Sequence, residues 1–250
     1  MKSFDPEKAS LMRESGKRLS YVKHALVSMV APGVFFEEIE KKAQELIASQ
    51  DSTPSFMTHP GYKYATCLTK NEGCCHGLPI GKTVEEGDLI TIDVGLVYKG
   101  WHTDTSITVY VGDETKAPEK IRKFLDTGKR ALANGIAKAI VGNSVYDISL
   151  AIQQTLENSG YGAVYQLTGH GIGKSLHESP YIPDVAYPQD KKLKLSLGQT
   201  IAIEPMYAMG NPYLILGKDK WTYETKDRSL TGMFEETVMI TSGKPEILTK

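Results

Sequence analysis

The sequence predicts an α+β fold of two similar halves, each with two helices followed by strands of a central antiparallel sheet. Apolar residues recur at helical spacing over 6–30 and 36–48, and again over 119–139 and from about 145 to 158. The strand motif Gly87-x-x-Ile90-x-Ile92-Asp93 returns in the second half as Gly198-x-x-Ile201-x-Ile203-Glu204, with the same internal spacing. So long a repeat indicates a duplication with pseudo-two-fold symmetry, with halves of about 1–113 and 114–250 in a single domain.

Turn residues separate the expected elements. Pro32-Gly33 ends the first helix, and Gly142-Asn143-Ser144 separates the later pair at the corresponding place in the second half. Each of these glycines precedes an acid and an isoleucine that open a helix, Glu38-Ile39 in the first half and Asp147-Ile148 in the second. The segment 52–64 contains prolines and glycine and predicts a loop, which is followed by a short strand over 65–69.

The stretch 87–111 predicts a β-hairpin that carries two acids. Segments 89–97 and 103–111 alternate β-branched and polar residues around the turn Tyr98-Lys99-Gly100. With the turn centred near Tyr98 and Lys99, Asp93 and Asp104 are expected directly opposite each other, where like charges are destabilising. A bound cation would explain the pair. Alternatively, one Asp caps the turn and the other lies on a solvated face.

The repeat adds further acids to this pair. Glu204 ends the repeated motif, and Glu235 in Phe234-Glu235-Glu236-Thr237 matches the acid-then-β-branched pattern of Asp104-Thr105. His170 lies between glycines in Gly169-His170-Gly171, a setting in which we expect the backbone to approach a ligand closely. Carboxylates with one imidazole and no thiolate favour two divalent ions such as Mn, Fe(II) or Co over a structural zinc finger. Two such ions would activate water and polarise a carbonyl group.

Composition excludes several functional classes. The chain has 250 residues, 40% of them hydrophobic, and a net charge of −1, so no overall attraction to nucleic acid or membranes is implied. No apolar run approaches the length of a membrane span, and the N-terminus lacks an apolar signal segment. Cys67, Cys74 and Cys75 form no paired motif and are expected to be free thiols. We therefore expect a cytoplasmic protein.

These motifs together resemble type I methionine aminopeptidases over nearly the whole chain. The resemblance rests on Asn71-Glu72-x-x-Cys75-His76-Gly77-x-Pro79, the two Asp strands, Gly169-His170-Gly-Ile-Gly with His177-Glu178, Ile203-Glu204-Pro205, and the segment from Trp221 to Glu235. It implies the pita-bread fold and removal of the initiator methionine from nascent chains when the second residue is small. The segment between His170 and Glu204 is too short for the helical insertion of type II enzymes. We also expect no N-terminal zinc-finger extension.

The resemblance further implies roles for individual residues. The ligands of two divalent ions (Co, Mn, Fe(II) or Zn) would be Asp93, Asp104, His170, Glu204 and Glu235, with Asp104 and Glu235 bridging. His76 and His177 would contact the substrate and the tetrahedral intermediate, and Glu204 would also move protons. The methionine pocket would be lined by His59, Tyr62, Cys67, Leu176 and Trp221, a polarizable surface that suits a thioether.

The resemblance also implies partners, and the chain departs from the family at one place. We expect a monomer that acts on N-terminal Met peptides of nascent chains and contacts the ribosome through a basic loop with Lys218, Lys220, Lys226 and Arg228, although such charges are commonly only a solvated face. Gly232-Met233 replaces the usual Ala-Gln, and Glu236 replaces the usual His. An added carboxylate beside a ligand could lower activity or shift metal preference.

Three rival functions remain at this stage. An X-Pro aminopeptidase of the same fold usually has an additional N-terminal domain and further histidines. A binding protein that keeps the fold without the chemistry typically loses ligands, and a low-activity paralogue would belong to this class. A two-metal phosphatase would need more histidine ligands and a phosphate-binding group.

Overall fold

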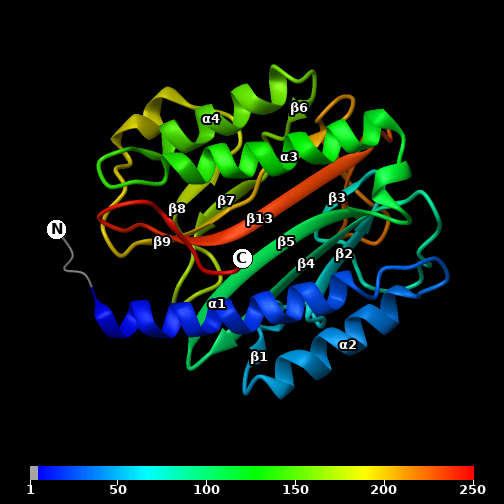
Figure 1. Ribbon diagram of the computed structural model, residues 1–250, viewed down its shortest axis with the longest axis horizontal. Coiled ribbons are helices and arrows are strands. Elements are labelled where there is room, and N and C mark those ends of the chain that lie inside the picture. The colour runs from blue at the N-terminus through cyan, green and yellow to red at the C-terminus, as the bar shows by residue number, and fades with distance from the viewer. Residues whose placement is uncertain (1–4) are drawn as a thin grey trace.

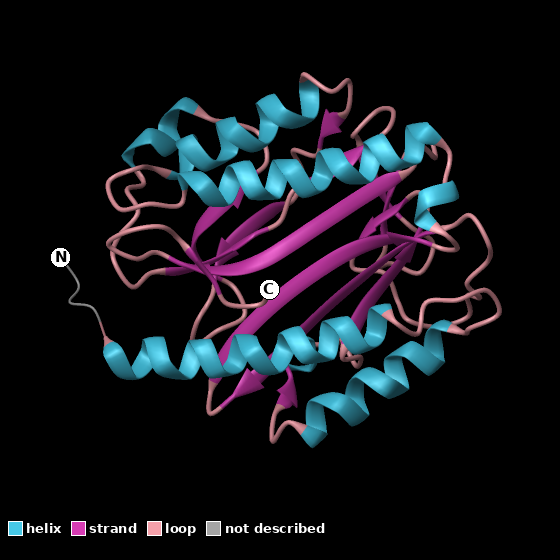
Figure 2. Ribbon diagram, in the orientation of Figure 1, coloured by secondary structure: helices cyan, strands magenta, loops and turns pink. Residues whose placement is uncertain are grey.

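The computed structural model describes residues 5–250. The first four residues of the N-terminus, where no signal segment is expected, lie outside the described residues. It has the pita-bread arrangement, with two helix pairs along a large antiparallel sheet (Figures 1 and 2). The helices are α1 (Pro6–Val27), α2 (Phe36–Ser49), α3 (Glu119–Lys138) and α4 (Val145–Glu157). The strands are β1 (Thr53–Pro54), β2 (Thr66–Lys70), β3 (Gly73–Cys75), β4 (Leu89–Tyr98), β5 (Trp101–Tyr110), β6 (Gly162–Ala163), β7 (Thr168–Gly171), β8 (Glu178–Pro183), β9 (Thr200–Ile203), β10 (Met206–Ala208), β11 (Leu214–Leu216), β12 (Tyr223–Thr225), β13 (Thr231–Met239) and β14 (Glu246–Ile247).

The main sheet brings the two halves of the chain together at its centre. Its order is β1-β4-β5-β13-β9-β7-β8, with β2, β6, β10 and β14 paired beside this path, and β11-β12-β3 form a small second sheet. The adjacent strands β5 and β13 join the two halves, with Glu235 opposite Ser106 and Glu236 opposite Thr105. The sheet is therefore continuous across the duplication.

The hairpin of β4 and β5 forms as expected, but its register differs from the prediction. Tyr98 pairs with Trp101, and Lys99 and Gly100 both have positive φ angles, 49° and 75°, as in a type I′ turn. The turn centre therefore lies one residue later than expected. In consequence Asp93 faces Ser106 and Asp104 faces Gly95, so the prediction that the two acids are directly opposite is wrong.

The two helix pairs follow the duplication. In Figure 1, α1 and α2 lie along the β4–β5 side of the sheet, and α3 and α4 lie along the β13–β9 side. Each pair packs on its own hydrophobic cluster, with Leu19 and Ile39 in one and Phe124 and Ile148 in the other. No helix within residues 5–250 is long and apolar enough to cross a bilayer.

Local contacts repeat between the halves at the predicted places. The backbone N–H of Phe35 donates to Glu38 Oε1 at 2.9 Å, and that of Ser144 donates to Asp147 Oδ2 at 2.7 Å. In both cases an acid one turn into the helix satisfies an amide at the helix start. Gly33 and Gly142 have φ angles of 91° and 90°. The helix α1 ends at Val27 rather than at residue 30, because the backbone N–H groups of Met29 and Val30 bond to carbonyl groups only three residues back.

Candidate metal centre and substrate cavity

Five predicted ligands lie on consecutive strands of the sheet. They are Asp93 on β4, Asp104 on β5, Glu235 on β13, Glu204 just after β9 and His170 on β7. Ligand atoms of Asp104, His170 and Glu235 all lie within 4.8 Å of one another. His170 Nε2 is 3.7 Å from Glu204 Oε1. Residues from both halves of the sequence thus meet in one cluster.

The hydrogen bonding of this cluster is incomplete without a cation. Asp93 Oδ1 and Glu235 Oε1 are buried and have no hydrogen-bond partner. All four acids and His170 are buried, with exposed fractions between 2% and 9%. Buried carboxylate oxygens are normally paired or coordinate a metal. The donor set, four carboxylates and one imidazole, fits divalent ions that prefer oxygen ligands.

The electrostatics of the cluster lead to the same conclusion. Burial raises the pKa of the Asp104 carboxyl to about 7. Burial, followed by repulsion from Asp104, raises the pKa values of Asp93, Glu204 and Glu235 well above their ordinary range. Crowded, desolvated carboxylates take up protons unless a cation neutralises them.

His170 is held in the form that ligates metals. Its Nδ1 lies 2.8 Å from the Gly171 carbonyl oxygen, to which a protonated Nδ1 donates, leaving Nε2 directed at the acids. Burial lowers the pKa of His170 to about 4, so the ring is neutral at pH 7. The flanking glycines serve strand packing and not ligand approach. A Cβ at Gly169 would lie 2.5 Å from the Ala202 carbonyl oxygen, and one at Gly171 would lie 2.5 Å from that of Ser179.

His76 and His177 lie beside the cluster. His177, in the loop between β7 and β8, packs edge-on against His170 with ring centroids 4.4 Å apart. His76 follows β3 with a positive φ of 55°, an uncommon conformation for a residue other than glycine. Burial, then the neighbouring His177, lowers the pKa of His76 to about 4. Both rings can therefore donate or accept a hydrogen bond while neutral.

The predicted site residues all line one cavity of about 380 Å³. Tyr62, Cys67 and Leu176 belong to a buried apolar cluster at this cavity, against which Trp221 packs. The Tyr62 and Trp221 rings meet at a centroid distance of 5.1 Å, and the His59 ring lies 6.2 Å from that of Trp221. An apolar pocket thus opens directly onto the acid cluster.

Sequence reasoning missed other residues of the cavity wall. They are Phe56, Gln166, Leu167, Thr168 and Tyr181, together with Cys75, which was not predicted from the sequence to lie at the site. Gln166 to Thr168 precede His170 on the chain, so their closeness to a predicted ligand was the available signal. Tyr181 faces His170 across β7 and β8, a pairing that requires the strand register.

Two of the three departures from the family pattern, Gly232 and Glu236, lie at strand positions that face away from the acid cluster. Glu235 lines the cavity, whereas Glu236 contacts Lys23 of α1 at 2.8 Å. Neighbouring residues of a strand face opposite sides of a sheet. Gly232 packs against the Tyr207 ring, where a Cβ would lie 2.8 Å from ring atoms. Met233 lies in a small buried cluster with Cys74 and Met206.

Comparison with known proteins identifies the family. The sequence profile of metallopeptidase family M24 matches residues 10–242. The chain belongs to this family. A methionine aminopeptidase of Clostridium perfringens is 36% identical over 239 residues, which cover 96% of this chain and 94% of that protein. The crystal structure of methionine aminopeptidase from Thermotoga maritima has a TM-score of 0.94 at 34% identity and covers 98% of both chains.

These similarities place the chain among the methionine aminopeptidases of the family. The chain is therefore a metal-dependent hydrolase that uses a divalent metal cofactor. A prolidase from Pyrococcus furiosus shares the fold, with a TM-score of 0.79 at 23% identity. It is a longer protein, of which this chain covers 65%. The predicted pita-bread fold is confirmed by these structures.

Proposed function

We propose that this protein removes the N-terminal initiator methionine from nascent chains whose second residue is small. The observation that carries the proposal is the apolar pocket of Tyr62, Cys67, Leu176 and Trp221, which opens onto a cluster of buried acids with unpaired oxygens. Apolar, polarizable walls suit a thioether side chain. The peptide bond that follows this side chain would then lie at the acids.

Two divalent ions would be held by Asp93, Asp104, His170, Glu204 and Glu235, with Asp104 and Glu235 shared between them. Asp104 and Glu235 suit that role because they lie on the central strand pair, between Asp93 on β4 and His170 on β7. When bound, such ions would lower the pKa of a water molecule, so that hydroxide is available to attack near neutral pH. They would also polarise the substrate carbonyl group. The native metal would be Co, Mn, Fe(II) or Zn.

The remaining steps are assigned to side chains of the cavity. Glu204, whose pKa is raised by burial, would accept a proton at its carboxylate from the attacking water and pass it to the leaving amine. His177 and His76 would donate hydrogen bonds to the substrate amide and to the oxygen on which charge develops. His59, beside Trp221, would line the pocket that holds the methionine side chain.

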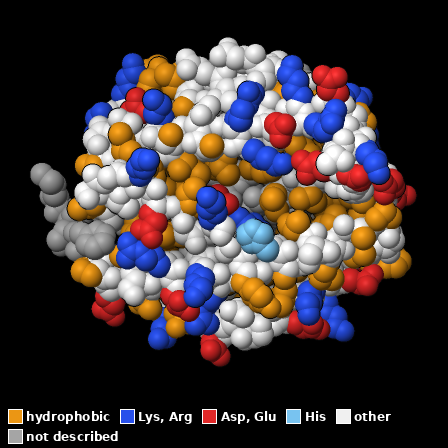
Figure 3. Space-filling view, viewed as in Figure 1, with side chains coloured by type: hydrophobic (Ala, Val, Ile, Leu, Met, Phe, Trp, Pro, Cys, Tyr) orange, Lys and Arg blue, Asp and Glu red, His pale blue; other side chains and the backbone are white. Residues whose placement is uncertain are grey.

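The partners that we propose follow from this activity. The substrate is a nascent chain, and the basic residues Lys218, Lys220, Lys226 and Arg228 would contact the ribosome in a cytoplasmic protein that acts as a monomer. Arg228 pairs with Glu72, so part of this charge is already neutralised. Figure 3 shows basic and acidic side chains interspersed on the helical face. Lys218 and Lys220 precede β12, and Lys226 and Arg228 follow it, so the ribosome contact is assigned to the two loops that flank β12 rather than to a broad charged surface.

The proposal is tested by peptide cleavage. Chelated protein is supplied separately with Mn, Fe(II), Co or Zn and incubated with Met-Gly-Met-Met, Leu-Gly-Met-Met and a peptide with an X-Pro bond. Metal-dependent release confined to Met is expected. Cleavage of the X-Pro peptide instead would favour a prolidase-like activity. If folded protein cleaves none of the peptides with any of the metals, a binding role would be favoured.

A further inference from the structure

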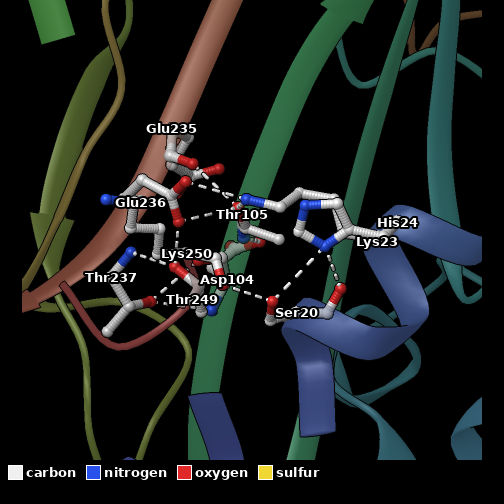
Figure 4. Close-up of polar contacts among 10 residues, drawn as sticks. All are labelled: Ser20, Lys23, His24, Asp104, Thr105, Glu235, Glu236, Thr237, Thr249 and Lys250. Atoms are coloured by element: carbon white, nitrogen blue, oxygen red, sulfur yellow. Dashed lines mark hydrogen bonds and ion pairs between the residues drawn. The ribbon is translucent and has the colours of Figure 1, made fainter. Parts of the chain in front are cut away.

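A largely buried ion pair lies behind the acid cluster, on the sheet face opposite the cavity. Lys23 of α1 is 5% exposed, and its Nζ lies 2.8 Å from Glu236 Oε1 and 3.1 Å from Thr105 Oγ1 (Figure 4). Lysine is rarely buried unless it is paired. Because burying two charges costs desolvation energy, such a pair is weak evidence for added stability. What the pair touches is therefore more informative than its presence.

Thr105 links this pair to both proposed bridging acids. Its hydroxyl has a single proton, and the Glu235 carbonyl oxygen at 2.8 Å is nearer than Glu236 Oε2 at 3.4 Å. The hydroxyl therefore donates to the backbone carbonyl oxygen of Glu235 and accepts from the Lys23 ammonium group. The backbone N–H of Thr105 donates to Asp104 Oδ1 at 2.9 Å. One residue thus contacts Asp104 and Glu235, and Lys23 fixes that residue.

The backbone pairing of β5 with β13 ends at this point. Its last paired residues are Thr105 and Glu236. Beyond them, the hydroxyl of Thr237 accepts from the Asp104 N–H at 3.0 Å and donates to the Asp104 carbonyl oxygen at 2.8 Å. A side chain here replaces the ladder between the strands. The distance between the strands that carry Asp104 and Glu235 therefore depends on side-chain contacts.

Glu236 closes these contacts into a network. Its Oε2 accepts from the Thr249 hydroxyl, whose oxygen in turn accepts from the Thr237 N–H at 2.9 Å. Glu236 thus ties Lys23 of α1 to Thr249 near the C-terminus, and Thr249 bonds to the residue that holds Asp104 (Figure 4). A charged partner shortens and strengthens such hydrogen bonds.

We propose that Lys23 and Glu236 are a positioning pair that fixes Asp104 relative to Glu235, and so sets the geometry offered to the two divalent ions. This inference rests on the two-ion centre of the proposed function. Neither residue lines the cavity. Their effect passes through Thr105 to both acids, and through Thr249 and Thr237 to the backbone of Asp104.

Two explanations, a long-range charge effect and positioning of the acids, predict opposite changes in metal affinity for Lys23→Met. Lys23→Met removes a positive charge near the cations, so long-range electrostatics alone predicts tighter metal binding. Positioning predicts weaker binding, because Thr105 loses its donor. For Glu236→Gln both effects predict weaker binding. The sign of the Lys23→Met effect therefore separates the two explanations.

The experiment measures Mn(II) and Co(II) affinity by calorimetry on chelated protein, with the Co(II) absorption spectrum as a second readout. Lys23→Met and Glu236→Gln are each expected to weaken at least one ion about tenfold or more, as for other contacts that orient ligands. The Co(II) spectrum should change in both variants. Glu246→Gln is the matched control, since the Arg13–Glu246 pair at 2.7 Å also joins α1 to the C-terminal segment but lies on the surface. It should keep wild-type affinity and spectrum.

Equal or tighter ion binding by Lys23→Met would overturn the proposal, as would the same loss in Glu246→Gln. If a single variant fails to fold, Lys23→Met/Glu236→Gln replaces it, because no unpaired charge remains; wild-type affinity there would also overturn the proposal. The readouts need no substrate. Wild-type protein that binds two ions but releases no methionine would refute the proposed function and leave the positioning role standing.

Discussion

Glu235 and Glu236 are neighbours on β13, yet they face opposite sides of the sheet. Glu235 lines the cavity and leaves one carboxylate oxygen without a partner, whereas Glu236 is paired with Lys23. The same strand therefore supplies a proposed metal ligand to one face and one member of an ion pair to the other. The additional negative charge that Glu236 brings close to the ligands is offset by a cation from α1.

Asp104→Asn should lose metal and activity together. Asp104 is within 4.8 Å of ligand atoms from His170 and Glu235, and an amide replaces a shared carboxylate there. Elemental analysis after metal reconstitution should show fewer than two ions per chain, with no methionine release. Asp113→Asn, at an exposed acid, should retain both. A fully loaded, active Asp104→Asn protein would refute the assignment.

His177→Ala should separate metal binding from turnover. His177 packs against His170 but is not one of the proposed ligands. We expect two ions to remain bound while kcat falls by about a hundredfold or more, the usual cost of one lost oxyanion donor. The exposed His24 supplies a control, and His24→Ala should behave as wild type. Loss of metal from His177→Ala would show that its role is structural.

The contribution of Asp104 to the stability of the metal-free protein should be lost as the pH rises toward 7. Burial raises the pKa of Asp104 to about 7, so between about pH 4 and pH 7 the folded state binds more protons than the unfolded chain. A group of this kind stabilises the fold at low pH, and the contribution is lost toward its folded pKa. Divalent ions bind the deprotonated acids. Added Mn(II) should therefore raise the melting temperature more at pH 8 than at pH 5, and equal shifts would contradict this account.

Leu176→Ala should weaken selection for methionine. Leu176 is 8% exposed and belongs to the apolar cluster that lines the cavity. A difference of one or a few methylene groups in such a pocket is worth about 10- to 200-fold in discrimination. We expect KM for Met-Gly-Met-Met to rise within that range with a smaller change in kcat. Leu216→Ala, at a 48% exposed leucine, is the control. An unchanged KM would place the methionine elsewhere.

The starts of α2 and α4 could be predicted from the sequence because their signals are local. A glycine with positive φ and a helix-opening acid occur at corresponding places in both halves, and the structure repeats those contacts. The hairpin register could not be obtained in the same way. Moving the turn centre by one residue, from near Tyr98 to the Lys99-Gly100 pair, shifts every cross-strand partner by two positions. Asp93 and Asp104 consequently approach each other diagonally.

The ligand set could be proposed from the sequence because acids in β-branched strands are unusual. The contacts that hold these ligands in place could not be predicted from the sequence. Lys23 and Glu236 lie far apart in the chain, and nothing in the sequence around Lys23 distinguishes it from a surface lysine of α1. The same holds for Tyr181 in the cavity wall, which depends on pairing between β7 and β8.

A crystal structure of the protein reconstituted with Mn(II) or Co(II), with anomalous scattering recorded at the metal edge, tests the central claim most directly. Two peaks about 3.5–4 Å apart are expected. Asp104 and Glu235 should contact both, Asp93 one, and His170 with Glu204 the other. A single peak in active protein, or peaks away from these five residues, would contradict the two-ion centre.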